Sequence, residues 1–94
     1  MRGRRVDTIQ QVWDGEPGDY ALTPEYDAVW LKLPTGSLGR LPVTKGASHD
    51  DPPTWQLIEH EDGTITLDPS IQQEAIPGHA PYWHGFLRHG EFSE

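Results

Sequence analysis

The sequence has no cysteine among its 94 residues, which excludes disulfide bonds and thiolate metal sites. It also lacks a run of about 18 apolar residues, so no helical membrane span is expected. The basic start of the chain, residues 1–5, is not followed by an apolar stretch and does not have the pattern of a secretory signal peptide. Small secreted domains with weak cores usually carry disulfides, so their absence favours an intracellular protein or one stabilised by assembly.

Aliphatic side chains are also scarce. Leu, Ile, Val and Phe together account for 19 of the 94 residues, a share at which disorder competes with folding. Four tryptophans and three tyrosines add large apolar surfaces that can complete a small core. The length fits a single domain, residues 1–94. Such a marginal core predicts stabilisation by other protein subunits, in a homo-oligomer or a larger assembly.

The charge is strongly negative and unevenly placed. Seven basic residues stand against 15 acidic ones, for a net charge of −8, and Arg2, Arg4 and Arg5 form a basic N-terminal arm over residues 1–5. The acidic remainder repels a phosphate backbone, so we expect no direct nucleic-acid binding by the body of the domain. We expect the arm to tether the protein electrostatically to an acidic partner, with a purely solubilising arm as the alternative.

Alternation of apolar and polar residues predicts a β-rich chain. The β-branched content favours a strand over Val6–Trp13, and Tyr26–Leu33 with Leu38–Thr44 forms a predicted hairpin. Tyr20–Tyr26 contains a proline and is expected to be a loop or a short edge segment. Residues 45–53 are rich in Gly, Pro and Asp, which predicts an exposed loop.

The block Trp55–Phe92 predicts two further hairpins. In the first, a three-residue loop that ends at Gly63 places Leu57 opposite Leu67, with Gly63 in the left-handed conformation. Ser70–Ala75 then fits either one helical turn or an extended continuation of the chain.

The second hairpin is predicted from the strand Tyr82–Arg88, a turn at His89 and Gly90, and the return strand Glu91–Ser93. Together these segments predict an all-β domain. We expect a small sandwich or partly open barrel of consecutive β-hairpins, with about six short strands and at most one short helical turn.

Four of the five histidines lie in the C-terminal block and raise the question of a metal site. Histidine is a common zinc ligand, and His79 and His84 are the pair that a metal would use. His84 and His89 are an odd number of residues apart, so they point to opposite faces of a regular strand. We therefore expect neither a metal site nor another cofactor.

Ser70, His84 and Asp68 can be drawn as a nucleophilic relay. No nucleophile-elbow motif accompanies them in the sequence. We therefore assign no catalytic residue, and the balance of the sequence is towards a non-enzymatic protein, although nothing in it excludes an enzyme.

Two motifs in the C-terminal block are shared with a known family. The first, W-x-L-x-E-H-x-D-G-T-I-T-L-x-P-S-I, runs from Trp55 to Ile71, and the second, W-H-G-F-L-R-H-G-E-F, runs from Trp83 to Phe92. On these motifs the sequence resembles an uncharacterised family of small proteins encoded mainly by tailed bacteriophages. The resemblance implies a phage origin and a β-rich fold, without an activity. Relatives often carry a cysteine before the histidine that matches His84, which suggests metal binding in them, and this chain has no such cysteine.

The resemblance and the marginal core predict a non-enzymatic phage accessory or virion structural protein. It would act through protein–protein contacts of the assembly or decoration type, in the virion or the host cytoplasm, and without membrane contact. Aromatic side chains anchor many protein interfaces, and the expected apolar contact residues are Tyr82, Trp83 and Phe86. The alternative is a small-molecule- or metal-binding phage protein, such as a host-defence inhibitor or a small enzyme, that uses the region of His79, His84 and Asp68.

Overall fold

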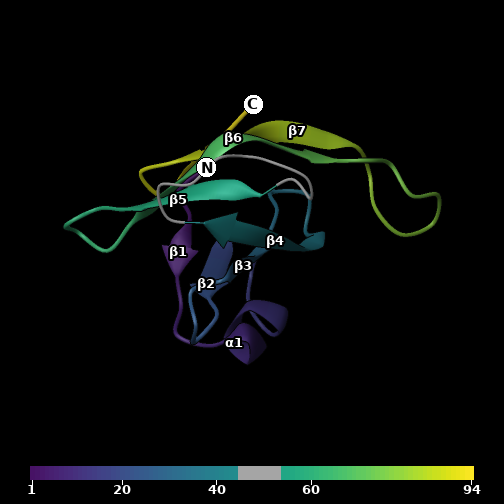
Figure 1. Ribbon diagram of the computed structural model, residues 1–94. Helices are drawn as coiled ribbons and strands as arrows, with labels where there is room; N and C mark the ends of the chain where they lie inside the picture. Colours follow the sequence, from purple (N-terminus) through teal and green to yellow (C-terminus); the bar gives the residue numbers. More distant parts are fainter. Residues whose placement is uncertain (45–53) are drawn as a thin grey trace.

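The computed structural model describes residues 1–44 and 54–94, which form one curled eight-stranded sheet and a short helix (Figure 1). The elements are β1 (Arg4–Arg5), α1 (Ile9–Trp13), β2 (Asp19–Leu22), β3 (Ala28–Lys32), β4 (Leu38–Thr44), β5 (Trp55–Glu59), β6 (Ile65–Gln73), β7 (Trp83–Arg88) and β8 (Glu91–Ser93). The strands lie in the sheet in their sequence order. The pairs β1–β2 and β4–β5 are parallel, and the other pairs are antiparallel. In this part of the chain no helix has the length and apolarity that a membrane crossing requires.

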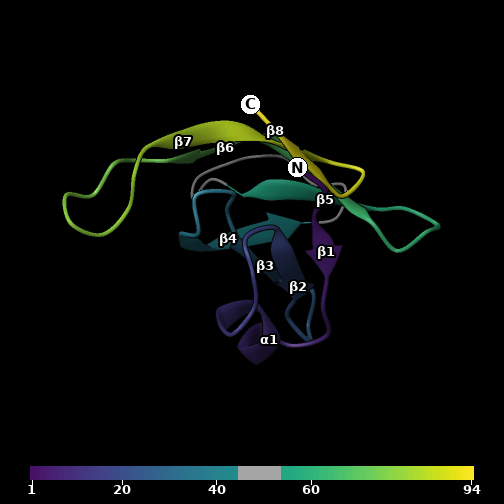
Figure 2. The same cartoon turned by 180° about the vertical axis from the view of Figure 1, so that it is seen from behind.

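The sheet curls into a half-barrel, with β5 to β8 across one side and β2, β3 and α1 on the other (Figures 1 and 2). Backbone hydrogen bonds join its two ends. Met1 N donates to the Phe92 carbonyl at 2.7 Å, Phe92 N donates to the Met1 carbonyl at 2.8 Å, and Gly3 N donates to the Gly90 carbonyl at 2.7 Å. The predicted all-β class is confirmed, and the curled single sheet corresponds to the partly open barrel rather than the sandwich. The strand number is larger than the predicted six.

The hydrophobic core draws on every strand from β2 to β8. Because the sheet is curled, inward-facing side chains from distant strands meet, which lets few aliphatic residues form one cluster. Its buried members are Tyr20, Leu22, Val29, Leu31, Leu33, Val43, Leu57, Ile65, Leu67, Ile71, Trp83, Leu87 and Phe92. Three aromatic residues stand among them, as the scarcity of aliphatic residues requires.

The segment Val6–Trp13 contains the helix α1, so the predicted strand is wrong there. Thr8 is the N-cap: its hydroxyl accepts from the Gln11 backbone N–H at 3.2 Å, and the Gln11 side chain accepts from the Thr8 N–H at 2.9 Å. This capping box satisfies backbone groups that the first turn leaves unpaired. At the other end, Lys32 Nζ donates to two carbonyl oxygens. Local capping outweighs the β-branched content of this short segment.

The segment predicted as a loop or an edge, Tyr20–Tyr26, overlaps the buried strand β2, which lies between β1 and β3. The Asp19 carboxylate at its start is buried and accepts two bonds from the Arg4 guanidinium, at 3.2 and 2.9 Å. Burial alone would raise the pKa of Asp19, but the bonds from Arg4 and from the Glu16 N–H outweigh it and lower this pKa. The ion pair therefore holds β1 against β2.

The other two arginines of the basic arm are also part of the sheet. Arg5 Nη1 donates to Glu59 at 3.0 Å and to the Gly63 carbonyl at 3.0 Å, and Arg2 lies 3.6 Å from Glu91. Residues 1–5 therefore close the half-barrel rather than project from it. Their use as a tether to a partner stays a prediction, as does the single-domain organisation. The predicted loop 45–53 lies outside the described residues.

Both hairpins of the C-terminal block are confirmed. Leu57 lies opposite Leu67 in the β5–β6 ladder, and Gly63 in the connecting loop has φ +87°. The β7–β8 connection is the predicted two-residue turn, in which His89 has φ +48° and Gly90 has φ +74°. Positive φ at both central positions matches the right-handed twist of the flanking strands. The two long hairpins, β5–β6 and β6–β7, project in opposite directions from the half-barrel (Figures 1 and 2).

Candidate functional site

Strand β6 contains an irregularity at its centre. Leu67 lies opposite Leu87, and Ile71 lies opposite Gly85. Between these two pairs, β6 therefore contains two more residues than β7. Such bulges disrupt the ladder locally and redirect side chains, and they are common next to functional sites. Ser70 lies in this bulge. Of the two alternatives predicted for the segment from Ser70, the extended one is found.

The bulge brings Ser70 to His84 on the neighbouring strand. Ser70 Oγ lies 2.9 Å from His84 Nε2. His84 lies opposite Gln72 in the ladder and points away from the core, and its side chain is exposed. Ser70 is half-buried. The pair is therefore reachable from solvent.

This geometry is suited to general-base activation of the Ser70 hydroxyl by His84. A serine hydroxyl that donates to a neutral imidazole can lose its proton to that imidazole as it attacks an electrophile. The separation of 2.9 Å between Ser70 Oγ and His84 Nε2 is within the reach that general-base catalysis needs. Sequence analysis named both residues but had no motif to join them, because their contact depends on the register between β6 and β7.

Asp68, the third residue of the relay drawn from sequence, stands opposite Gln56 on β5 and is exposed. The cross-strand neighbour of His84 is Gln72, whose amide donates to Glu74 at 2.7 Å. The geometry thus brings Ser70 and His84 together as a dyad, while Asp68 pairs across the ladder with the strand on the other side of β6.

Two residues support the dyad from the core side of the sheet. The Trp55 indole Nε1–H donates to the Ser70 carbonyl at 3.1 Å, and Trp55 packs against the core cluster. Gly85, next to His84, leaves room for the Trp83 ring: a Cβ at Gly85 would lie 2.7 Å from that ring and would also meet the Ser93 carbonyl. The strand that carries His84 therefore tolerates no side chain at this position without displacing its neighbours.

A second hydroxyl of β6, nearer the start of the strand, is paired with an imidazole just after the end of β5. Thr66 Oγ1 is 2.7 Å from His60 Nε2. The same oxygen accepts the backbone N–H of His89 at 2.9 Å. The His60 and His89 rings are stacked, with centroids 3.8 Å apart and an angle of 14° between their planes. Sequence analysis missed this cluster, although the alternation of β5 and β6 places His60 and Thr66 on one face.

The remaining predicted site residues are not gathered around the dyad. His79 is exposed on the β6–β7 loop, and the described residues contain no group of His, Cys, Asp or Glu suited to hold a metal ion. Trp83 is 3% exposed and belongs to the core, so it offers no contact surface. Tyr82 is 54% exposed, and Phe86 is half-buried beneath the Arg88 guanidinium, which lies 4.2 Å from the ring centroid. Partner contact by Tyr82 and Phe86 stays a prediction.

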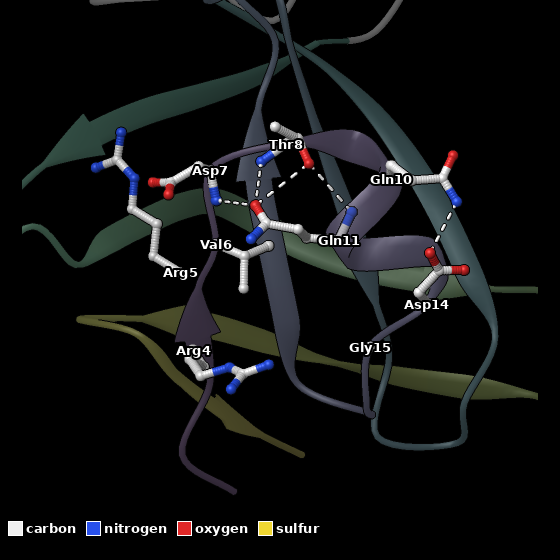
Figure 3. Close-up of a pocket in the computed structure, with 9 residues that line it drawn as sticks. All are labelled: Arg4, Arg5, Val6, Asp7, Thr8, Gln10, Gln11, Asp14 and Gly15. Atoms are coloured by element: carbon white, nitrogen blue, oxygen red, sulfur yellow. Dashed lines mark hydrogen bonds between the residues drawn. The ribbon is translucent and has the colours of Figure 1, made fainter.

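A surface groove lies between β1 and α1 (Figure 3). Several of its polar groups bond to one another: the Gln11 side chain accepts from the Asp7 and Thr8 backbone N–H groups in the helix cap, and Gln10 donates to Asp14 at 3.0 Å. Arg4 at its rim is paired with Asp19. The bonds given by these residues cap the helix and join β1 to β2, which is a structural role.

An all-β domain with a serine hydroxyl and an imidazole in contact on adjacent strands is a candidate serine hydrolase. The chain belongs to the BubE family, whose model matches residues 5–94 and is described as a bacterial ubiquitination-like system serine protease. No curated protein and no solved structure matches the chain.

The family corrects the predicted function. A non-enzymatic phage accessory or virion protein is wrong, because the family is a bacterial one and its description names a protease. The match gives no support to a phage origin or to a place in the virion. The two motifs that suggested the phage family lie on β5 to β8 and contain Ser70 and His84. Sequence analysis interpreted them chiefly as a fold pattern.

Proposed function

We propose that this chain is a serine protease with Ser70 as the nucleophile and His84 as the general base. The observation that carries the proposal is the 2.9 Å separation of Ser70 Oγ and His84 Nε2 on a solvent-accessible face. Membership of a family described as a serine protease supports it independently.

The reaction follows the chemistry of the two groups. Ser70 Oγ attacks the carbonyl carbon of a peptide bond while His84 Nε2 takes the hydroxyl proton. The protonated imidazole then gives this proton to the leaving amine as the C–N bond breaks, which leaves an ester on Ser70. Water attacks the ester with His84 again as the base, and the acid product leaves. The dyad is restored without any other reactant.

The substrate we propose is a polypeptide of the ubiquitination-like system that the family description names. The support for a macromolecular substrate is the openness of the site, since His84 lies on an exposed sheet face rather than in a deep cavity. The protein partners expected from sequence would then include this substrate.

The test is covalent labelling with a fluorophosphonate probe, which reacts with activated serine hydroxyls. We expect one adduct per chain by intact mass, mapped to Ser70 after digestion. Ser70→Ala should abolish it. Ser93→Ala is the matched control, because Ser93 is exposed on β8 and has no part in the dyad.

Two results would contradict the proposal. One is a folded wild-type protein that takes up no probe at any concentration at which known serine hydrolases are labelled. The other is an adduct that persists in Ser70→Ala or that maps to a different serine.

A further inference from the structure

The carbonyl group of Ser70 has an unusual partner for a strand residue. In a regular antiparallel ladder this group would bond to a backbone N–H of the neighbouring strand. In the register between the described strands β6 and β7, no residue of β7 lies opposite Ser70. The Ser70 carbonyl instead accepts from the indole N–H of Trp55 on β5, at 3.1 Å.

Trp55 is well placed to hold this carbonyl still. Its ring is half-buried and packs against the core cluster, and it lies on the same face of β5 as the buried Leu57. A ring fixed by packing loses little further freedom when it bonds, so its N–H is a rigid donor. Ser70 is thereby bonded through its main chain to the core and through its hydroxyl to His84.

We propose that Trp55 is a positioning residue for the protease reaction, which sets the backbone of the bulge so that Ser70 Oγ faces His84. The inference rests on the proposed function. Rotation of the peptide group after Ser70 moves the atoms attached to its Cα, and a displacement near 1 Å at a reacting group lowers rates by about a hundredfold. Trp55 touches neither the substrate nor the reacting atoms in this role.

The experiment compares Trp55→Phe with Trp30→Phe. Phe at 55 keeps an aromatic ring but removes the N–H. Trp30 on β3 is also half-buried and has an edge contact with Trp13, remote from the dyad in sequence and strand order. The measurement is fluorophosphonate labelling resolved into the inactivation rate at saturation and the probe concentration for half-saturation.

For Trp55→Phe we expect the saturating rate to fall by roughly tenfold to a hundredfold, with the half-saturating concentration unchanged. Trp30→Phe should leave both unchanged at a similar melting temperature. A purely structural Trp55 would lower the melting temperature and spare the rate of the folded protein, and that result overturns the inference. If Trp55→Phe does not fold, benzothienylalanine at position 55, which keeps the bicyclic shape and replaces N–H by sulfur, gives the same comparison.

The outcomes separate the two proposals. Absence of labelling in the folded wild-type protein overturns the protease assignment. Labelling of wild type at Ser70 with an unchanged saturating rate in both position-55 variants overturns the role of Trp55 alone.

Discussion

Two hydroxyl groups of strand β6, those of Thr66 and Ser70, each lie close to an imidazole of a neighbouring segment, but the surroundings of the two pairs differ. Thr66 Oγ1 lies 2.7 Å from His60, and Ser70 Oγ lies 2.9 Å from His84. The Thr66 oxygen also accepts the His89 N–H, and the His60 ring is covered by the stacked His89 ring. The first pair ties the β5–β6 hairpin to the β7–β8 turn.

A short distance between a hydroxyl oxygen and an imidazole nitrogen is not enough to make the hydroxyl a nucleophile. A hydroxyl oxygen that already accepts a backbone N–H is less free to attack, and an imidazole stacked on a second ring is shielded from substrate. The His84 ring has a looser contact, with the tilted Phe86 ring at a centroid distance of 6.3 Å and an angle of 43°. The main chain of Ser70 is bonded to Trp55 through its carbonyl. The surroundings of each pair, rather than its distance, are therefore the basis on which we propose Ser70 and His84, and not Thr66 and His60, as the reactive pair.

The largest expected difference is in activity. His84→Gln should lower the rate of probe labelling by roughly 10²- to 10⁴-fold, because it removes the general base. The matched variant His60→Gln should leave that rate unchanged. Intact-mass kinetics of the two variants would measure this. Equal rates for both, or a greater loss in His60→Gln, would reverse the assignment of the two pairs.

For stability we expect the Thr66–His60 pair to matter more than the Ser70–His84 pair. Thr66→Val leaves the His89 N–H and the His60 ring without their shared oxygen and should cost about 1–3 kcal/mol in the free energy of unfolding. Ser70→Ala should change it by less than about 0.5 kcal/mol, because its partner His84 is exposed and water can replace the lost hydroxyl. Denaturant titrations of both variants test this. A Ser70→Ala protein that is the less stable of the two would show that the dyad is itself structural.

The smallest expected effect concerns the loop that carries His60. The Thr64 hydroxyl and backbone N–H both bond the Asp62 carboxylate and lower its pKa. A lowered pKa contributes stability above the ordinary Asp value of about 4, and this contribution is lost as the pH falls through the folded pKa. The wild type should therefore exceed Asp62→Asn in melting temperature more at pH 6 than at pH 3. An advantage that stays constant between these pH values would exclude the link.

Sequence patterns predicted the C-terminal hairpins well because their signals are local. Gly63 provides the left-handed residue of its loop, and the pair His89 and Gly90 forms the turn before β8. Strand β2 was missed for the opposite reason. Its burial between β1 and β3 comes from partners elsewhere in the chain, while the proline that follows it suggested a loop.

The sequence analysis named Ser70 and His84 as a possible relay but had no ground to choose them as a site. Whether Ser70 meets His84 depends on the two additional residues that β6 inserts between Leu67 and Ile71, and no pattern of alternation reveals a bulge of this kind. The bond from Trp55 has the same origin, since it joins strands whose register the sequence leaves open. Only the three-dimensional register distinguishes Ser70 from Ser37 and Ser93, the other serines that the structure describes.

The closure of the half-barrel also bears on the order in which the chain can fold as it is made. The partners Met1 and Phe92 are 91 residues apart, whereas Ser70 and His84 are separated by 14. Contacts between distant residues carry the larger entropy cost and tend to form late. Residues 1–3 are synthesised before residues 90–92 and can pair with them only after that later segment has been made. The β6–β7 hairpin, which carries Ser70 and His84, can therefore assemble as a local unit while the ends of the sheet are still apart.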